Sequence, residues 1–363
     1  MARLLRAILG RIEGEHERRM LDWCDGNPYF AEELVSWMVA RKVMVFGKAG
    51  WHLVDGDADL ELPAGIEGAI QGRLDHLSAE QREILKGASV FGEIFWEDAL
   101  SILDIPNLGR ELEGLAALDF VARAEDSSFA GTRQWFFRHT LLVQVAYRMV
   151  PKARRQELHC LAGEWLESAG EEDAAILAQH YARGGDLLRA TMHQARVAER
   201  ALAEGDLDRA LASFASSLVP GAGTIPRDQF LNRLLGLATT QLRRGDLMAV
   251  QATVDRMEGG GANDVPLLVA ELCFLRGRVE LIRGGHDEAQ VLLLDAIDRF
   301  WRLGERHRAF EVKHTLFSAI WVEGRYDDAG PLAEALHREA APERPEQLCS
   351  AKLASAFYNI TSG

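Results

Sequence analysis

The hydrophobic positions of this chain recur mainly at helical spacing, interrupted by short runs rich in β-branched and aromatic residues. Residues 1–19 predict an amphipathic helix, and a break at "GNP" precedes a second helix from about residue 28 to residue 41. Two β-prone runs follow in "KVMVFGKAGWHLV", where Gly47 and Gly50 are typical of a hairpin turn. The chain is therefore predicted to begin with helices and one small hairpin.

Residues 78–150 predict three helices and a second hairpin. The first helix begins with a capping box, because Ser78 is followed three positions later by Gln81. The second helix is predicted in "FWEDALSILDI" and the third in "LGRELEGLAALDF", and "FVARAEDSSFAGTRQWFFRH" supplies two β-rich runs joined by a polar turn. Three helices followed by a hairpin predict a winged helix.

Beyond Pro151 the pattern is helical throughout, and it repeats. Turn glycines recur at intervals of 40, 40 and 39 residues, at Gly205, Gly245, Gly285 and Gly324. Intermediate turns near Gly185 and Gly304 fall half a period away, as pairs of antiparallel helices require. We predict an α-solenoid that is tetratricopeptide-like, with a period longer than the about 34 residues of strict units. Its partner site is predicted on the first helices of the hairpins, between about residues 182 and 340.

The charge of the chain narrows the choice of partner. A net charge of −14 disfavours nucleic acid and anionic membranes, which attract an excess of Lys and Arg. In the third predicted helix Arg110 stands against two glutamates, and the predicted wing balances its charges, Arg123 and Arg133 against Glu125 and Asp126. A packing or regulatory winged helix is therefore favoured over one that reads DNA.

Composition also bears on location. The chain has 48% hydrophobic residues, and the length suits two or three domains. It contains no apolar stretch of about 18 residues, so no membrane span is expected. Its cysteines lie far apart and fit single buried thiols in a reducing compartment: Cys24, Cys160, Cys273 and Cys349. We expect a cytoplasmic protein.

Motifs that carry catalytic chemistry are absent from the sequence. It contains no G-x-x-x-x-G-K-[ST] loop, no H-E-x-x-H and no G-x-S-x-G. His307, Glu311 and His314 could share one helix face, but a solvated polar face is favoured over a zinc site. We expect no catalytic or metal-binding residue, and no enzyme activity from this chain alone.

Five segments, taken in order, resemble a known family: the "GNPYFAEEL" break, "LPAGIEGAIQGRLDHLS", "ILKGASVFGEIF", "WFFRHTLLVQVAY" and the tetratricopeptide-like tail. Together they resemble the C-terminal part of bacterial signal-transduction ATPases with numerous domains, the STAND class. The nearest type is the large regulator whose ATPase module is fused to a nucleotide cyclase, a protein kinase or a transcriptional output domain. The resemblance covers nearly the whole chain and is strongest over residues 20–218.

The resemblance implies three domains: a helical lid over residues 1–77, a winged helix over 78–150, and a tetratricopeptide-like sensor arm over 151–363. The phosphate-binding loop and magnesium-binding acid of the family would lie upstream of Met1, and this chain contains neither. It would then bind no cofactor alone, whereas the parent protein would use ATP or ADP with magnesium. An upstream nucleotide-binding core is therefore an expected partner.

Three residues are implied as nucleotide contacts. Taken alone, "GNP" is a sound helix start, since Asn27 can cap it and Pro28 suits its first turn. In the family this turn resembles the element whose proline packs on adenine, so Pro28 would contact the base and Gly26 would permit close approach. His139 of "FRH" resembles the histidine that reaches the diphosphate. A plain helix-start proline and a structural histidine stay open as alternatives.

Two functions follow from this reading. The first is a regulatory and scaffolding fragment of a STAND-type ATPase, in which the solenoid binds a protein or small-molecule effector while the lid and winged helix gate an ATP/ADP switch. Activation would open the protein and allow it to oligomerise. The alternative is a stand-alone transcriptional regulator with a DNA-reading winged helix and an effector-binding solenoid.

Overall fold

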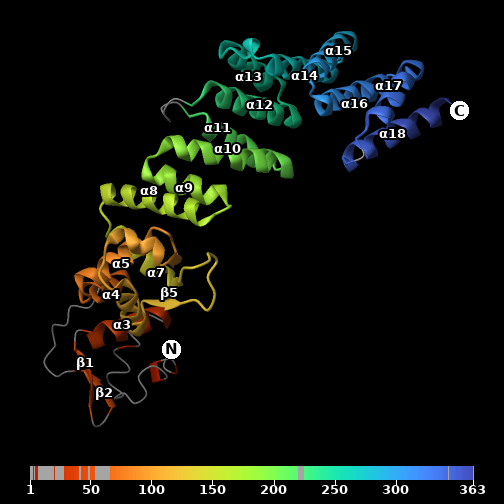
Figure 1. Ribbon diagram of the computed structural model, residues 1–363. Helices are drawn as coiled ribbons and strands as arrows, with labels where there is room; N and C mark the ends of the chain where they lie inside the picture. Colours follow the sequence, from red (N-terminus) through yellow and green to blue (C-terminus); the bar gives the residue numbers. More distant parts are fainter. Residues whose placement is uncertain are drawn as a thin grey trace. The chain divides into compact units, whose positions relative to one another are not determined.

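The computed structural model shows a mainly helical protein with two small antiparallel sheets (Figure 1). The chain divides into two compact units, Met1–Asp186 and Leu187–Gly363, which are described separately. The structure describes Arg3, Leu5, Arg6, Met20 and residues 28–40, 42–47, 50–53, 66–219, 225–341 and 343–362. Within these ranges no helix is both long enough and apolar enough to cross a membrane.

The first unit contains the helix and hairpin predicted after the "GNP" break, whereas most of the helix predicted over residues 1–19 lies outside the described residues. Helix α3 (Pro28–Ala40) is followed by β1 (Met44–Gly47) and β2 (Gly50–Leu53), which pair antiparallel. Helix α4 (Ile66–Asp75) packs against α3. Burial of the apolar face of α3 drives this packing, and its fully or nearly fully buried members include Leu34, Trp37 and Met38.

A three-stranded sheet with helices on its edges and face forms the centre of the first unit. The elements in chain order are α5 (Ala79–Ser89), β3 (Ile94–Trp96), the 3₁₀ helix η1 (Asp98–Leu103), α6 (Leu108–Ala117), β4 (Val121–Arg123), β5 (Gln134–Phe137) and α7 (Thr140–Arg148). The strand order is β3-β5-β4. The capping box is confirmed, because the Gln81 backbone donates to the Ser78 hydroxyl at 3.1 Å and the Ser78 backbone donates to the Gln81 side chain.

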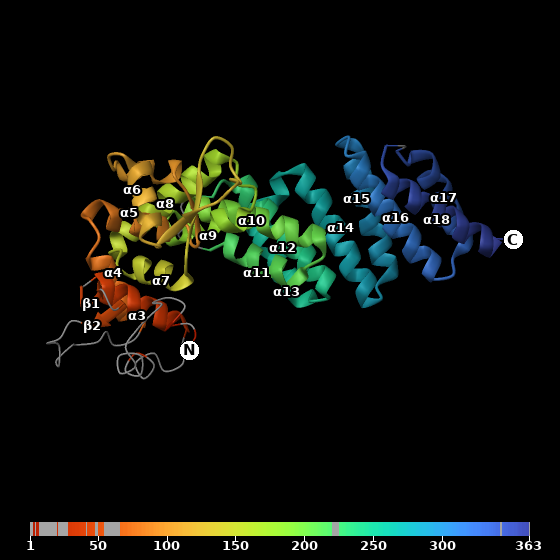
Figure 2. The same ribbon diagram turned by 90° about the horizontal axis from the view of Figure 1, so that it is seen from below.

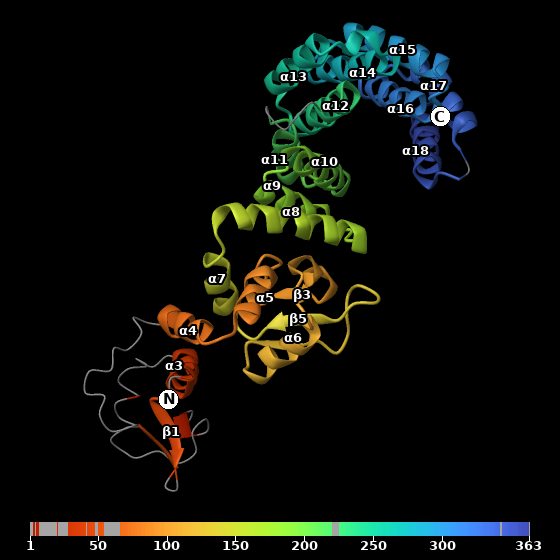
Figure 3. The same cartoon turned by 60° about the vertical axis from the view of Figure 1, so that its left-hand side comes forward.

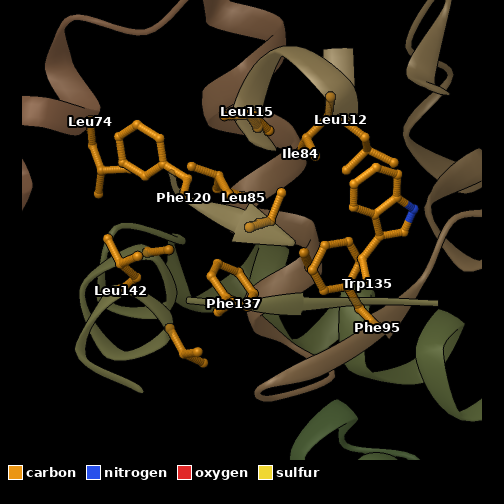
Figure 4. Packing of buried hydrophobic residues seen from close by; sticks show 14 of the residues in the cluster. Leu74, Ile84, Leu85, Phe95, Leu112, Leu115, Phe120, Trp135, Phe137 and Leu142 are labelled. Carbon is orange, nitrogen blue, oxygen red and sulfur yellow. The ribbon is translucent and has the colours of Figure 1, made fainter. Parts of the chain in front are cut away.

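The prediction of an α-helix for the second element of this region is wrong. "FWEDALSILDI" forms a strand and a 3₁₀ helix because its aromatic start joins the sheet, where Ile94 pairs with Phe136 and Phe95 with Trp135. Long-range pairing thus overrides the helical pattern. Figure 4 shows the resulting core, in which the fully buried Trp135 and Phe95 pack against side chains from α5 and α6.

Two further helices belong to the same unit, α8 (Lys152–Ala169) and α9 (Ala174–Gly184). Aromatic rings join them to the sheet region: Trp96 stacks on Trp165 at 5.4 Å between ring centroids, and Phe91 lies 6.0 Å from His180. His180 is buried against His159, with their Nδ1 atoms 3.3 Å apart. We call Phe91, Trp96, Tyr147, His159, Trp165 and His180 the aromatic–histidine cluster.

The second unit consists of helices packed in consecutive pairs (Figures 2 and 3). They are α10 (Leu187–Glu204), α11 (Leu207–Ser217), α12 (Arg227–Arg244), α13 (Leu247–Gly259), α14 (Pro266–Arg283), α15 (His286–Arg302), α16 (Arg306–Val322), α17 (Tyr326–Glu339) and α18 (Pro345–Ser362), with the short 3₁₀ helix η2 (Ala262–Asp264) before α14. In Figure 3 the unit curves, with α12, α16 and α18 on its inner side and α13, α15 and α17 on its outer side. This is the predicted solenoid-like arrangement.

The repeated turns follow one local design. Gly205, Gly245 and Gly324 have φ near +80°, the left-handed conformation that ends a helix without a Cβ penalty. The third turn departs from the predicted spacing, since Gly284 has the positive φ and Gly285 precedes the next helix with φ −82°. Asp206 and Asp246 follow their glycines and accept hydrogen bonds from the backbone of the next helix. At each of these turns the glycine therefore ends one helix and the aspartate caps the start of the next.

This design predicts the cost of breaking a turn. Gly245→Ala and Asp246→Ala are each expected to lower the free energy of unfolding by about 1 kcal/mol, through left-handed strain and a lost N-cap respectively. Gly259→Ala is the matched control, because Gly259 lies in helix α13 with open space around it and no positive φ. Urea denaturation measures all three, and equal losses at 245 and 259 would contradict the assignment.

Cysteine placement differs in part from expectation. Cys160 and Cys273 are half-buried, but Cys349 is exposed on α18. The Cys273 thiol donates to Asp295 at 3.3 Å, and burial together with that carboxylate raises its pKa. The neutral thiol of Cys273 is therefore favoured.

Candidate binding site on the inner helices of the second unit

A pocket of about 720 Å³ lies on the inner helices of the second unit. Nearly all of its lining comes from α12, α14, α16 and α18, which are the helices at one position of the successive pairs. The partner site was predicted on the first helices of the hairpins between about residues 182 and 340. Helices α12, α14 and α16 lie in that range, whereas α18 lies beyond it. The volume falls in the range of small-molecule sites, about 300 to 1,000 Å³.

One wall of the pocket is an ion network between α14 and α16. The Arg308 guanidinium is bidentate to Glu271, with Nε to Oε1 at 2.7 Å, and it also contacts Glu311. Glu271 is only 7% exposed. Although burial disfavours its charge, hydrogen bonds to Glu271 and the charges of both carboxylates raise the pKa of Arg308. These three charges are mutually satisfied and form a rigid part of the site.

A hydrogen-bonded chain extends this network to α18. The backbone N–H of Ala341 donates to Gln347 Oε1 at 3.1 Å, which places the Gln347 amide nitrogen 2.7 Å from His307 Nδ1. Since that amide donates, His307 carries its proton on Nε2, which lies 3.4 Å from Glu311. Gln347 is buried, so these hydrogen bonds fix the position of the His307 ring.

Arg278 stands apart from these pairs. Its guanidinium lies over the Phe274 ring at 5.7 Å from the centroid, and no described carboxylate is within ion-pair distance of it. Burial, and then the charges of Arg243 and Arg308, lowers the pKa of Arg278, with Glu311 acting in the opposite direction. Arg243 also lines the pocket, and its side chain donates to the backbone carbonyl of Leu202 at 3.2 Å.

The remaining polar lining is mostly hydroxyl and imidazole. Thr239, Thr315 and Ser318 each donate to a carbonyl one turn back in their own helix, at 2.8 to 3.0 Å. Each hydroxyl oxygen therefore keeps its lone pairs as acceptors facing outward. Burial lowers the pKa of His314, which favours its neutral form.

The sequence pattern favoured a solvated polar face over a zinc site at His307, Glu311 and His314. In the structure the Glu311 carboxylate contacts Arg308 and His307. No cluster of three metal-ligating side chains occurs among the described residues. Sequence reasoning did not identify Arg278 or Arg243. No sequence motif marks either residue, because pairing depends on which helices meet.

Of the three residues implied as nucleotide contacts, Pro28 and His139 are described and lie in the first unit. Gly26 lies outside the described residues. Pro28 is exposed and is the first residue of α3, as its predicted helix-start role requires. His139 is half-buried and precedes the first turn of α7, with extended φ and ψ and no side-chain hydrogen bond capping that helix. Helix α4 packs against both α3 and α7.

Arg73 of α4 links these elements and was missed by sequence reasoning. It is buried, pairs with the buried Glu33 of α3 at 2.7 Å, and donates to the Leu118 carbonyl at 3.0 Å. Its guanidinium also lies 4.5 Å from the Phe120 ring centroid. One side chain thus joins the N-terminal helices to the sheet region across 40 and 45 residues of sequence.

This chain matches known proteins only among solved structures. No protein-family model matches this chain, and no curated protein matches it significantly. Among solved structures, it is similar to a signal transduction ATPase with numerous domains, a STAND protein with a tetratricopeptide repeat sensor, from Pyrococcus horikoshii. The identity is 11% and the TM-score 0.44, over 99% of this chain and 58% of that one. The chain thus spans a little over half the length of that protein.

Proposed function

We propose that this chain is the regulatory arm of a STAND-type signalling ATPase. In this proposal the second unit binds an effector, and the first unit, with its lid and winged-helix region, gates an ATP/ADP switch on an upstream nucleotide-binding core. The pocket on α12, α14, α16 and α18 is the observation that carries the proposal. It collects charged and hydroxyl groups from successive repeats on one face, which is how solenoids present binding surfaces.

Two features of the first unit support the gating role. Arg73 and the Arg148–Glu67 ion pair, at 2.6 Å, tie α4 to its neighbours, so the lid and the winged-helix region can move as one body. His139 stands at the N-terminus of α7, whose first turn contains no acidic residue, although the Glu93 carboxylate accepts from the Thr140 hydroxyl there at 2.6 Å. The unpaired N–H groups of a helix N-terminus favour a phosphate.

The mechanism we propose is a two-state switch. ADP would bridge the core and His139 and so favour a closed form. An effector in the second unit, together with ATP, would favour an open form able to oligomerise. The output domain, be it a cyclase, a kinase or a transcription factor, would respond to that opening.

His139→Ala in a parent protein that includes the nucleotide-binding core tests the switch. The expected result is a roughly ten- to hundredfold weaker ADP affinity, because a hydrogen bond to a charged group is worth about 1.5 to 3 kcal/mol. Effector-independent output should rise in parallel. Titration with a fluorescent ADP analogue measures the affinity.

His76→Ala is the matched control, since His76 is exposed on the same unit and, among the described residues, its imidazole hydrogen-bonds to the Gly72 carbonyl alone. It should leave ADP affinity unchanged. An ADP affinity that is equal in the parent and in His139→Ala, with the isolated chain strongly destabilised, would make His139 a structural residue and refute the gating role.

A further inference from the structure

Burial and neighbouring positive charges disfavour the charged form of Arg278. Around it, the other guanidiniums of α14 are paired, Arg276 with Glu258 at 2.7 Å and Arg283 with Glu280 at 2.9 Å. Arg308 across the pocket is saturated by two carboxylates. Among the described residues Arg278 alone of these arginines lacks an ion pair, although it is half-buried and feels the repulsion of Arg243 and Arg308.

Within the chain, Glu311 and the Phe274 ring offset the cost of this buried charge only in part, so a bound anion would stabilise it further. A half-buried guanidinium loses hydration, and the neighbouring Arg243 and Arg308 add repulsion. Residues that cost stability without an internal gain are typical of functional sites. Both Arg278 and Arg243 line the pocket, so an anion bound there would meet two guanidiniums.

The rest of the lining defines the other part of the ligand. Thr239, Thr315 and Ser318 commit their hydrogens to backbone carbonyls and offer acceptors. Acceptors bind ligand donors such as hydroxyl groups. Phe274 and Leu281 provide an apolar floor along the same helix as Arg278.

We propose that the pocket binds a hydroxylated organic anion, with Arg278 and Arg243 holding a carboxylate or phosphate and the three hydroxyl oxygens accepting from ligand hydroxyls. A guanidinium matches the oxygens of either anion in bidentate geometry. The pocket volume of about 720 Å³ accommodates a sugar acid or sugar phosphate. This inference rests on the proposed function, in which the ligand is the effector of the second unit.

Calorimetric titration of the full chain with gluconate and with glucose 6-phosphate tests the inference. These probes share hydroxyl groups and differ in the anion, and sorbitol, which has the hydroxyls without charge, is the control ligand. At least one anion is expected to bind saturably at millimolar concentration or below, and sorbitol far more weakly. Arg278→Met keeps the apolar stem and should weaken the bound anion roughly ten- to hundredfold.

Arg283→Met is the matched variant, since Arg283 lies on the same helix, is exposed and does not line the pocket. It should retain wild-type affinity. Arg278→Met should also melt no lower than wild type, because no internal ion pair is lost; a purely structural arginine would lower the melting temperature.

Three outcomes would overturn the inference: no saturable binding of either anion, equal effects of the two methionine variants, or tighter binding of an Asp/Glu-rich peptide than of both sugar anions. None of these would bear on ADP binding at His139. Failure here with success of the His139→Ala experiment would leave the switch standing and remove only the ligand assignment.

Discussion

Acidification from pH 7 to pH 5 is expected to lower the free energy of unfolding through His159 and His180, by about 2 kcal/mol for each. Burial first, then the charges of His180, Arg183 and Arg155, lowers the pKa of His159 from 6.5 to about 3. Burial and the Arg183 charge lower the pKa of His180 to about 4.

The sign of this effect follows from proton uptake. Between pH 6.5 and pH 4 the unfolded chain binds protons at both histidines while the native chain does not, so unfolding is favoured as the pH falls. The stability that the two neutral histidines contribute to the native chain is complete above pH 6.5, and it is lost progressively as the pH falls toward 3. The geometry explains the low pKa values: Tyr147 Oη lies 2.8 Å from His159 Nε2, and one hydrogen between the two Nδ1 atoms suffices for a neutral pair.

The double variant His159→Gln/His180→Gln isolates this contribution. Urea denaturation at both pH values should show a much smaller loss of stability on acidification than in wild type, whatever its stability at pH 7. His337→Gln, at an exposed position on α17, should keep the wild-type slope. An unchanged slope in the double variant would show that the buried histidines do not govern acid sensitivity.

Loss of Arg308 is expected to destabilise the second unit by about 3 kcal/mol or more. In Arg308→Met the Glu271 carboxylate, 7% exposed, is left without its bidentate partner in a buried position. Breaking one half of a buried pair costs far more than the pair contributes. Chemical denaturation monitored by circular dichroism measures the loss.

Replacing both partners separates an orphaned charge from lost packing. Arg308→Met/Glu271→Leu should recover most of the lost stability, because no buried charge remains. Arg302→Met is the surface control, since Arg302 is 77% exposed and pairs with Asp298 one turn away, and it should cost no more than about 0.5 kcal/mol. A double variant as unstable as Arg308→Met would instead assign the effect to the contacts of the Arg308 guanidinium with the Phe274 and Phe300 rings.

These predictions treat two arginines of one pocket in opposite ways. Arg308 is held by carboxylates and supports the fold, whereas Arg278 is unpaired and is assigned to a ligand. Stability should therefore fall on loss of Arg308 and hold on loss of Arg278. Binding of the anion should follow Arg278.

Local features of this protein could be predicted from its sequence because short-range physics determines them. The capping box at Ser78, the hairpin at Met44–Gly47 and Gly50–Leu53, and the turn glycines all depend on residues within a few positions of each other. The helical repeat followed from the spacing of those turns. The third turn was misplaced by one residue, because in "GG" either glycine can adopt the left-handed conformation and packing selected Gly284.

Only the tertiary structure decided the features that depend on distant partners. "FWEDALSILDI" has a helical pattern, but pairing of β3 with β5 some 40 residues away made its start a strand. The contact of His159 with His180 and the tie from Arg73 to Glu33 likewise join different helices. Above all, the sequence shows 41 basic residues without showing which of them are paired. Pairing is a property of three-dimensional neighbours, so the assignment of Arg308 to the fold and of Arg278 to a ligand required the packed helices.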